Sequence, residues 1–296
     1  MIRLGLIGCG AWGYRYIPAA LQTGFAKVTH ASASWHRPDV PASLVRVPTT
    51  EWRSLLQAPL DAFIVATPPD THEEICTTLL EAGRPVMVEK PFALSVEAAE
   101  RIAVAAAKSG VPLLVNHQHL FAPAFETLLD VVGDGRRWTL ESIAGNDGPE
   151  RSYSALWDYG PHDVAMAVAT AHRRGASAQV RAAIRALDAD SYRLEMSLGD
   201  SARMSAYVSR HLTKKTRLLR GTSCCGRVEY NEHAEHILTV DGKPRAVDPE
   251  RPLQRAIRHF AEAVKTGKTD WRFGAELPLA VTRILEQADR MTKPPS

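Results

Sequence analysis

The sequence predicts an α/β protein in two parts, a doubly wound parallel sheet followed by a second domain that contains an antiparallel sheet. From the first residue to about 120, short β-branched or apolar runs alternate with helix-like stretches, as in parallel βαβ units. Beyond residue 120 the pattern changes to the two-residue alternation of strands with one buried face. The predicted domains are therefore residues 1–120 and 121–296.

The first half contains clear signals for individual elements. Thr71 with Glu74 three residues later forms a capping-box pattern, and a helix that begins there should end at Gly83. The next helix is expected from Ser95 to Gly110. The apolar runs predict parallel strands at Ile2–Ile7, Lys27–Ala33, Ala62–Thr67, Pro85–Val88 and Val111–Val115.

The second half predicts an antiparallel sheet followed by two amphipathic helices. Asp241-Gly242 is a hairpin-turn signal, and apolar faces beginning near Leu253 and Leu277 have the spacing of helices. No internal repeat or long linker separates the two halves. Strands are expected at residues 192–198, 204–208, 216–219, 227–230 and 237–240.

Composition excludes several classes of protein. A chain of 296 residues that is 45% hydrophobic and 23% charged is neither disordered nor fibrous. Its 36 basic and 33 acidic residues are interspersed, so nucleic acid is not an expected partner. The four cysteines, Cys9, Cys76, Cys224 and Cys225, have no metal or redox spacing, and neither a secretion signal nor a membrane-spanning run is evident. We therefore expect a soluble cytoplasmic protein without membrane contacts.

A glycine motif follows the first predicted strand. Gly8, Gly10 and Gly13 form G-x-G-x-x-G between that strand and a predicted helix. Glycines at this spacing allow a tight turn, close approach of the backbone to a pyrophosphate and close packing of helix on strand. We expect a dinucleotide here, with Ala11 and Trp12 among its contacts. The alternative is that the glycines only make a tight turn.

The end of the second strand bears on the choice of nucleotide. NAD sites of this type usually carry an acidic residue there, but residues 28–37 contain none. Ser32, Ser34 and Arg37 would instead tolerate a 2′-phosphate, so NADP is favoured over NAD. In the alternative interpretation, Arg37 is simply solvated in a loop.

Lys90 is the first candidate for chemistry. It lies in Glu89-Lys90-Pro91, directly after an apolar strand. Ligands of open α/β sheets gather outside the carboxyl ends of the strands, so Lys90 would project where a nicotinamide and its substrate meet. A solubilising surface lysine is the alternative.

Asp158 and His162 form a second candidate pair. Pro161 suits the first turn of a helix, which leaves Asp158 just outside the helix and places His162 in its first turn. The helix dipole there disfavours an imidazolium, so His162 could accept a proton, although Asp163 would act in the opposite direction. Alternatively, Asp158 is only a cap and His162 a surface residue.

Together these motifs occur in the order and approximate spacing of one family. They are the glycines at 8–13, Thr67-Pro68-Pro69 with His72, Glu89-Lys90-Pro91, and the D-x-x-x-H of Asp158 and His162. In these motifs the chain resembles the Gfo/Idh/MocA oxidoreductases, well over the first 165 residues and in outline beyond. The resemblance implies a Rossmann domain followed by an α+β domain with a large, mostly antiparallel sheet, through which homodimers or homotetramers form.

The same resemblance implies hydride transfer between NAD(P) and a secondary alcohol of a sugar, polyol or nucleotide sugar. Lys90 and His162 would be the catalytic pair, Asp158 would bind and orient the substrate, and the bond before Pro91 would be cis. Thr67, Pro68, His72 and Glu89 would join the nucleotide site. Further polar residues suited to a polyhydroxy substrate are Asn116, His119, Asn146, Asp147 and Tyr153.

Two departures from the family pattern affect the substrate side. Residues 153–157 replace a glycine-rich lead, and His117 to Pro123 replace an Arg-Phe pair ahead of a proline. His117 and His119 could bind a metal, but no third ligand has a recognisable spacing, so we expect hydrogen-bonding roles and no metal. Two other functions stay open: redox-assisted cleavage of glycosides, and nucleotide sensing without catalysis, against which Lys90, Asp158 and His162 together argue.

Overall fold

A computed structural model describes most of the chain, namely residues 1–33, 41, 43–133, 136–148, 152–173, 180–188, 190–200, 202–224 and 226–292. The chain divides into two compact units. Unit 1 comprises residues 1–118 and 251–279, and unit 2 comprises residues 119–250 and 280–296. The functional domains 1–120 and 121–296 stay a prediction, and the return of residues 251–279 to unit 1 was not among the expectations.

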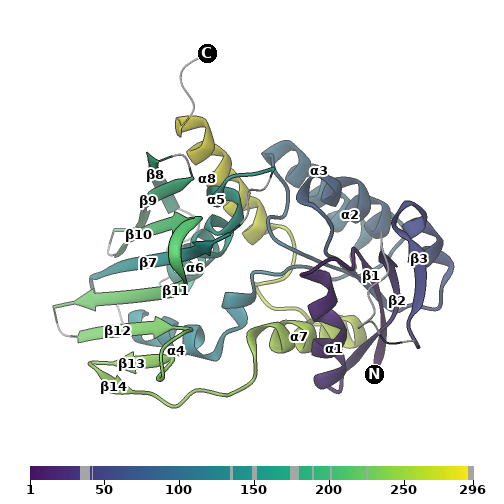
Figure 1. Ribbon diagram of the computed structural model, residues 1–296, viewed down its shortest axis with the longest axis horizontal. Helices are drawn as coiled ribbons and strands as arrows, with labels where there is room; N and C mark the ends of the chain where they lie inside the picture. Colours follow the sequence, from purple (N-terminus) through teal and green to yellow (C-terminus); the bar gives the residue numbers. More distant parts are fainter. Residues whose placement is uncertain are drawn as a thin grey trace. The chain divides into compact units, whose positions relative to one another are not determined.

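Unit 1 is built on a six-stranded parallel sheet with the order β3-β2-β1-β4-β5-β6 (Figure 1). The chain first winds outward from β1 to β3 and then restarts beside β1 with β4, so the switch point lies between β1 and β4. Its strands are β1 Ile2–Ile7, β2 Ala26–Ala33, β3 Val45–Pro48, β4 Ala62–Val65, β5 Val86–Val88 and β6 Leu113–Val115. The five predicted parallel strands are confirmed, some with shorter bounds, and β3 was missed.

The helices of unit 1 flank this sheet. The prediction for α3 is confirmed at both ends, because the Ser95 side chain accepts a hydrogen bond from the Ala98 N–H and Gly110 has a left-handed φ of 67°. Short 3-10 helices cover Gly13–Arg15, Thr49–Gln57 and Pro69–Thr71. The α-helices are α1 Tyr16–Gln22, α2 His72–Glu81, α3 Val96–Ser109 and α7 Pro252–Thr266.

The capping box predicted at the start of α2 is wrong. Thr71 already has helical backbone angles, φ −96° and ψ −9°, because a 3-10 turn begins at Pro69. Its hydroxyl donates to Thr67 Oγ1 at 2.7 Å and to the Pro68 carbonyl at 2.8 Å, so it does not cap the helix. The Thr71 hydroxyl therefore stabilises the loop after β4, and this loop is part of the candidate site.

Unit 2 contains an eight-stranded sheet with the order β14-β13-β12-β11-β7-β10-β9-β8, drawn mostly in teal and green in Figure 1. Among the described strands of this sheet, only β7 and β10 pair in parallel, which confirms a large, mostly antiparallel sheet. Asp241 and Gly242 have φ of 51° and 72°, as the predicted hairpin turn requires. The strands are β7 Trp138–Asp147, β8 Val180–Asp188, β9 Ser191–Leu198, β10 Ala202–Ser209, β11 His211–Ser223, β12 Gly226–Asn231, β13 Leu238–Val240 and β14 Lys243–Pro244.

Helix α6, Gly160–Arg173, is the buried helix of unit 2. Every residue from Gly160 to Ala167 is buried, which explains why the stretch after Asp163 is apolar on all sides. His162 lies in its first turn, as predicted. Asp158 lies just before α6, as predicted, but it is itself helical, because it ends α5, a separate four-residue helix. The remaining helices are a 3-10 turn at Gln118–Phe121, α4 Pro123–Val132, α5 Ala155–Asp158 and α8 Glu276–Thr292.

None of the helices in the described part of the chain combines the length and the apolar character that crossing a membrane requires.

Candidate functional site

The glycine loop after β1 uses each glycine for a different reason. Gly8 has a φ of 93°, and a Cβ there would lie 2.7 Å from the Ala66 carbonyl. At Gly13 a Cβ would lie 2.0 Å from the Gly8 carbonyl oxygen, so helix and loop touch directly. At Gly10, by contrast, a Cβ would meet nothing within 4 Å. The loop therefore leaves open space over the backbone at Gly10, which is where a pyrophosphate approaches in this motif.

Ser32, at the end of β2, holds this loop in place. The Gly8 N–H lies 3.3 Å from both the Ser32 carbonyl oxygen and its hydroxyl, and the Cys9 N–H donates to the same carbonyl at 3.1 Å. The Ser32 side chain is buried, so its hydroxyl is directed at the loop. Its predicted nucleotide contact stays a prediction, and Ser34 and Arg37 lie outside the described residues.

The Glu89 carboxylate accepts four hydrogen bonds within unit 1. Its Oε1 accepts hydrogen bonds from Trp12 Nε1 at 2.6 Å, the Tyr16 hydroxyl at 2.5 Å and Asn116 Nδ2 at 2.8 Å. Its Oε2 accepts the backbone N–H of Lys90 at 3.2 Å. These donors come from the glycine loop, from α1 and from the carboxyl ends of β5 and β6. One buried carboxylate thus ties the loop to the backbone of the candidate lysine.

Tyr16 is a residue of this site that the sequence did not indicate. Burial and the negative charge of Glu89 raise its pKa well above 10, so the hydroxyl stays protonated and donates to Glu89. The same hydroxyl accepts a hydrogen bond from Asn116 Nδ2 at 2.7 Å. Its only signal in the sequence was its place three residues after Gly13.

His72 braces the loops after β4 and β5. Its Nδ1 lies 3.0 Å from the Pro91 carbonyl oxygen and its Nε2 3.1 Å from that of Thr67. Burial lowers the pKa of His72, so the ring is neutral at pH 7 and donates through one nitrogen. The Lys90–Pro91 bond is cis, as the resemblance implied. His72 therefore acts on the site through the backbone at Thr67 and Pro91.

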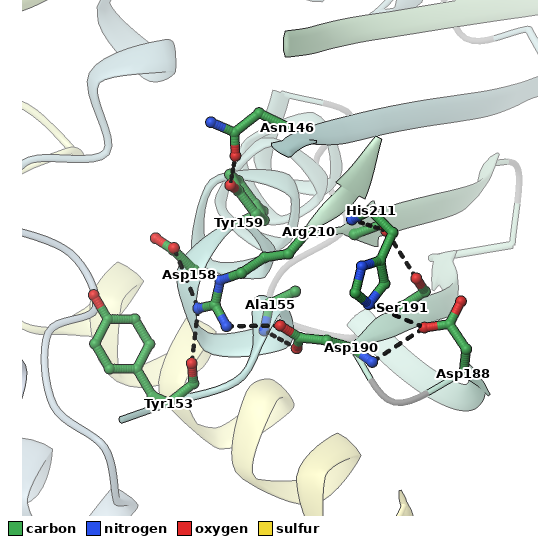
Figure 2. Close-up of polar contacts among 11 residues, drawn as sticks. Asn146, Tyr153, Ala155, Asp158, Tyr159, Asp188, Asp190, Ser191, Arg210 and His211 are labelled. Atoms are coloured by element: carbon green, nitrogen blue, oxygen red, sulfur yellow. Dashed lines mark hydrogen bonds and ion pairs between the residues drawn. The ribbon is translucent and has the colours of Figure 1, made fainter. Parts of the chain in front are cut away.

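In unit 2, Arg210 organises the surroundings of Asp158 (Figure 2). Its Nη2 donates to Asp158 Oδ2 at 3.4 Å and to the Tyr153 carbonyl at 2.7 Å. Its Nη1 donates to Asp190 Oδ2 at 2.7 Å, while the other Asp190 oxygen accepts the Ala155 N–H at 2.6 Å. The Asp158 carboxylate is therefore held by a buried guanidinium, and neither Arg210 nor Asp190 was among the predicted residues.

Two other polar candidates of unit 2 lie near this group. Asn146, in β7, accepts a hydrogen bond from the Tyr159 hydroxyl through its Oδ1, as Figure 2 shows. The Tyr153 ring lies against the Arg210 guanidinium, 5.9 Å from ring centroid to Cζ. Arg210 therefore contacts both the side chain and the carbonyl of Tyr153.

His162 lies against a second histidine, His119. The two rings are nearly perpendicular, at 88°, with their centroids 4.5 Å apart. His119 Nδ1 lies 2.9 Å from Glu232 Oε1, which also accepts the Tyr230 hydroxyl at 2.7 Å. Burial disfavours the Glu232 carboxylate, but His119, Tyr230 and Arg217 outweigh burial and lower the pKa of Glu232 to about 2. Glu232 and Tyr230 were not among the predicted residues.

The charge of Asp163, next to His162, is compensated by Arg217 within the core of unit 2. Its Oδ1 accepts a hydrogen bond from Arg217 Nη1 at 2.8 Å and another from the Ser142 hydroxyl. The carboxylate is fully buried, and Arg217 is buried beside it. The effect of Asp163 on His162 is therefore reduced by a neighbouring positive charge.

The structure groups the predicted residues within each unit. Lys90 belongs to unit 1 with Glu89 and Asn116, whereas Asp158 and His162 belong to unit 2. In the portion of the chain that the structure describes, no three His, Cys, Asp or Glu side chains cluster as metal ligands. The histidine pair at 117 and 119 thus acquires no third ligand there.

A doubly wound sheet with this glycine loop defines a Rossmann-type nucleotide-binding protein. The chain belongs to the Gfo/Idh/MocA oxidoreductases: residues 2–117 match the model of this family, described as an oxidoreductase family with an NAD-binding Rossmann fold. The crystal structure of a protein from Magnetospirillum magnetotacticum MS-1, provisionally named an oxidoreductase, is 32% identical. That match covers 96% of this chain and 98% of the other, with a TM-score of 0.83.

Curated relatives match over a shorter stretch. Inositol 2-dehydrogenase 2 of Saccharopolyspora erythraea is 30% identical over 178 residues, which are 56% of this chain and 52% of that protein. The 1,5-anhydro-D-fructose reductase of Ensifer adhaerens is 32% identical over 140 residues, 46% of this chain and 42% of that protein. The chain thus spans about half the length of these curated relatives or less.

The different surroundings of Gly10 and Gly13 lead to a prediction. Gly13→Ala should lower the free energy of unfolding by at least about 2 kcal/mol, because its Cβ would overlap the Gly8 carbonyl. Gly10→Ala should leave it unchanged within about 0.5 kcal/mol, because the space is open, yet weaken nucleotide binding. Urea unfolding and nicotinamide fluorescence measure the two effects. Unaltered NADH and NADPH affinity in Gly10→Ala would show that the loop does not bind the pyrophosphate.

Proposed function

We propose that this chain transfers a hydride between NAD(P) and a secondary alcohol or ketone of a sugar, polyol or related small molecule. The observation that carries the proposal is the Glu89 carboxylate, which joins Trp12 of the glycine loop to the backbone of Lys90. The proposal is supported by the position of Lys90 two residues after β5, at the carboxyl edge of the sheet where nucleotides bind to doubly wound sheets. The family, and relatives named for inositol and an anhydrosugar, support the substrate class.

Unit 1 offers a fitting site for the nucleotide. The open backbone at Gly10 would take the pyrophosphate, with Ala11 and Trp12 beside it and Thr67 and Pro68 at the end of β4. Asn116 Oδ1 is buried and has no hydrogen-bond partner among the described residues, so it can accept a donor from a ligand. The preference for NADP rests on the sequence around Ser32 and Arg37.

The bound nucleotide supplies or accepts the hydride, and this chain's residues handle the proton. In the direction of alcohol oxidation, His162 accepts the hydroxyl proton. Lys90 holds the hydroxyl oxygen and stabilises the negative charge that develops on it. Asp158 orients the substrate, and the Arg210 guanidinium at 3.4 Å holds its carboxylate in place. His119 and Tyr153 are two further residues that would contact the substrate.

The nucleotide proposal is tested by titrating the purified chain with NADPH and NADH while following nicotinamide fluorescence, after checking for nucleotide that co-purifies. We expect saturable binding of both, with NADPH tighter because no acidic residue in 28–37 opposes a 2′-phosphate. The Gly10→Ala variant serves as the control for binding at the loop. Absence of binding by either nucleotide in a preparation free of nucleotide would overturn the proposal.

The role of Lys90 is tested by substitution. With a polyol or sugar that the wild type oxidises, Lys90→Ala should lower kcat by a factor of about 100 or more and leave nucleotide affinity nearly unchanged. Lys108→Ala, an exposed lysine at the end of α3, is the matched control and should retain full activity. Equal turnover by wild type and Lys90→Ala would defeat the assignment. Turnover without net reduction of the nucleotide would favour glycoside cleavage instead.

We also propose that the sheet of unit 2 forms a homodimer or homotetramer. Buried and exposed residues alternate along its strands, so Glu195, Ser197 and Arg203 lie on a face that stays exposed. Light scattering on the protein as it elutes from a size-exclusion column should give the mass of two or four chains. A single-chain mass over a wide concentration range would contradict this proposal.

A further inference from the structure

The ring of His162 contacts His119, which belongs to a buried group of ionisable residues. His119 is 4% exposed and Tyr230 1% exposed, and both interact with Glu232, directly after β12. Because the rings of His119 and His162 are in contact, the group is linked to the proposed proton acceptor. Each of these residues lies in unit 2, so the arrangement is defined within one unit.

Hydrogen bonding fixes the tautomer of His119. Its Nδ1 lies 2.9 Å from the Glu232 carboxylate and 3.4 Å from the Tyr230 hydroxyl. An ionised carboxylate only accepts, so Nδ1 carries the proton, and in the neutral ring Nε2 carries the lone pair. Burial, followed by the charge of Arg217, lowers the pKa of His119 and keeps the ring neutral near pH 7. His119 is therefore held in one orientation and one tautomer.

The charges around the start of α6 are unbalanced. Among the described residues that contact one another there, four carboxylates face two guanidinium ions: Arg217 pairs with Asp163, and Arg210 with Asp158 and Asp190, while Glu232 is held by His119 and Tyr230. With both imidazoles neutral, this region carries excess negative charge. A proton added to His162 would therefore be stabilised by its surroundings.

Several other charged residues on elements that pack against α6 are engaged with partners of their own. Asp130 of α4 pairs with Arg173 at the far end of α6, at 2.7 Å. Arg193 and Glu195 of β9 both contact Ser205, and Arg193 also lies over the Tyr207 ring. Glu195 belongs to the exposed face of the sheet. Glu232 is thus the carboxylate that acts on His162 through an intervening ring.

We propose that His119 is a positioning residue for His162 and that the Glu232 carboxylate, acting through His119, stabilises the proton that His162 receives. In the oxidation direction that proton leaves the substrate hydroxyl, and the hydride goes to the nicotinamide. The role of this coupling in catalysis rests on the proposed function. The coupling itself, between His162 and Glu232, does not depend on that function. Glu232 and His119 therefore set how readily His162 becomes protonated.

The test is an NMR titration of the histidine rings in the full chain, which needs no substrate. The His162 resonance is assigned with His162→Gln. In Glu232→Gln the amide keeps a hydrogen-bond acceptor for His119 but removes the charge, so the midpoint of His162 protonation should fall by about half a unit to one unit. Glu229→Gln on β12, which removes a half-exposed carboxylate paired with Arg220, is the matched control and should leave the midpoint unchanged.

A second variant keeps the proposal testable if Glu232→Gln folds poorly. His119→Phe retains an aromatic ring against His162 but cuts the connection to Glu232, so it should also lower the midpoint. Because both substitutions interrupt one connection, the double variant should shift the midpoint by less than the sum of the two. Equal midpoints in wild type, Glu232→Gln and His119→Phe would overturn the proposal, as would fully additive shifts.

The kinetic readout separates this inference from the proposed function. With a substrate that the wild type oxidises, kcat/KM is measured against pH. The acid limb of this profile should move to lower pH in Glu232→Gln, while the KM for the nucleotide stays constant. A shifted NMR midpoint without any hydride transfer would refute the proposed function and leave the coupling intact. An acid limb unchanged by Glu232→Gln would refute the inference and leave the proposed function intact.

Discussion

The buried carboxylate of Glu89 is the interaction on which the arrangement of unit 1 depends. It accepts hydrogen bonds from Trp12, Tyr16, Asn116 and the Lys90 backbone, which belong to three segments: residues 12–16, the end of β6 and the chain directly after Glu89. A buried carboxylate is costly unless donors surround it, so loss of any segment would leave a charge without its full complement of donors. That cost favours the conformation in which the glycine loop and Lys90 are held together.

This arrangement is possible because the parallel sheet brings distant strand ends to one edge. β4, β5 and β6 are buried on both faces, so their apolar runs are continuous and their ends are fixed by the core. Polar side chains then occur directly after the strands, as Glu89 does after β5 and Asn116 after β6. The core therefore defines the positions, and the first residue or two beyond each strand carry the chemistry.

Residues at short, regular spacing made part of this site predictable from the sequence. Contacts between residues far apart in the sequence could not be predicted. The three glycines and the place of His162 follow from short motifs, and the cis Lys90–Pro91 bond follows from the family resemblance. Arg210, however, reaches Asp158 across 52 residues, and Tyr16 reaches Glu89 across 73, so no short pattern relates them. The Thr71 cap failed for a local reason, because a 3-10 turn precedes the helix and the Thr71 hydroxyl bonds that loop instead.

The two units compensate buried charge by different means. In unit 1 the Glu89 carboxylate is satisfied by neutral donors, which orient it without cancelling its charge. In unit 2, Asp158 and Asp163 are paired with Arg210 and Arg217, which cancel charge locally and hold each carboxylate in one position. Ion pairs hold a carboxylate ionised, whereas neutral donors leave its field acting on nearby groups. Unit 1 therefore orients the Glu89 carboxylate beside the Lys90 backbone through neutral donors, whereas unit 2 fixes Asp158 and Asp163 near the first turn of α6 through ion pairs.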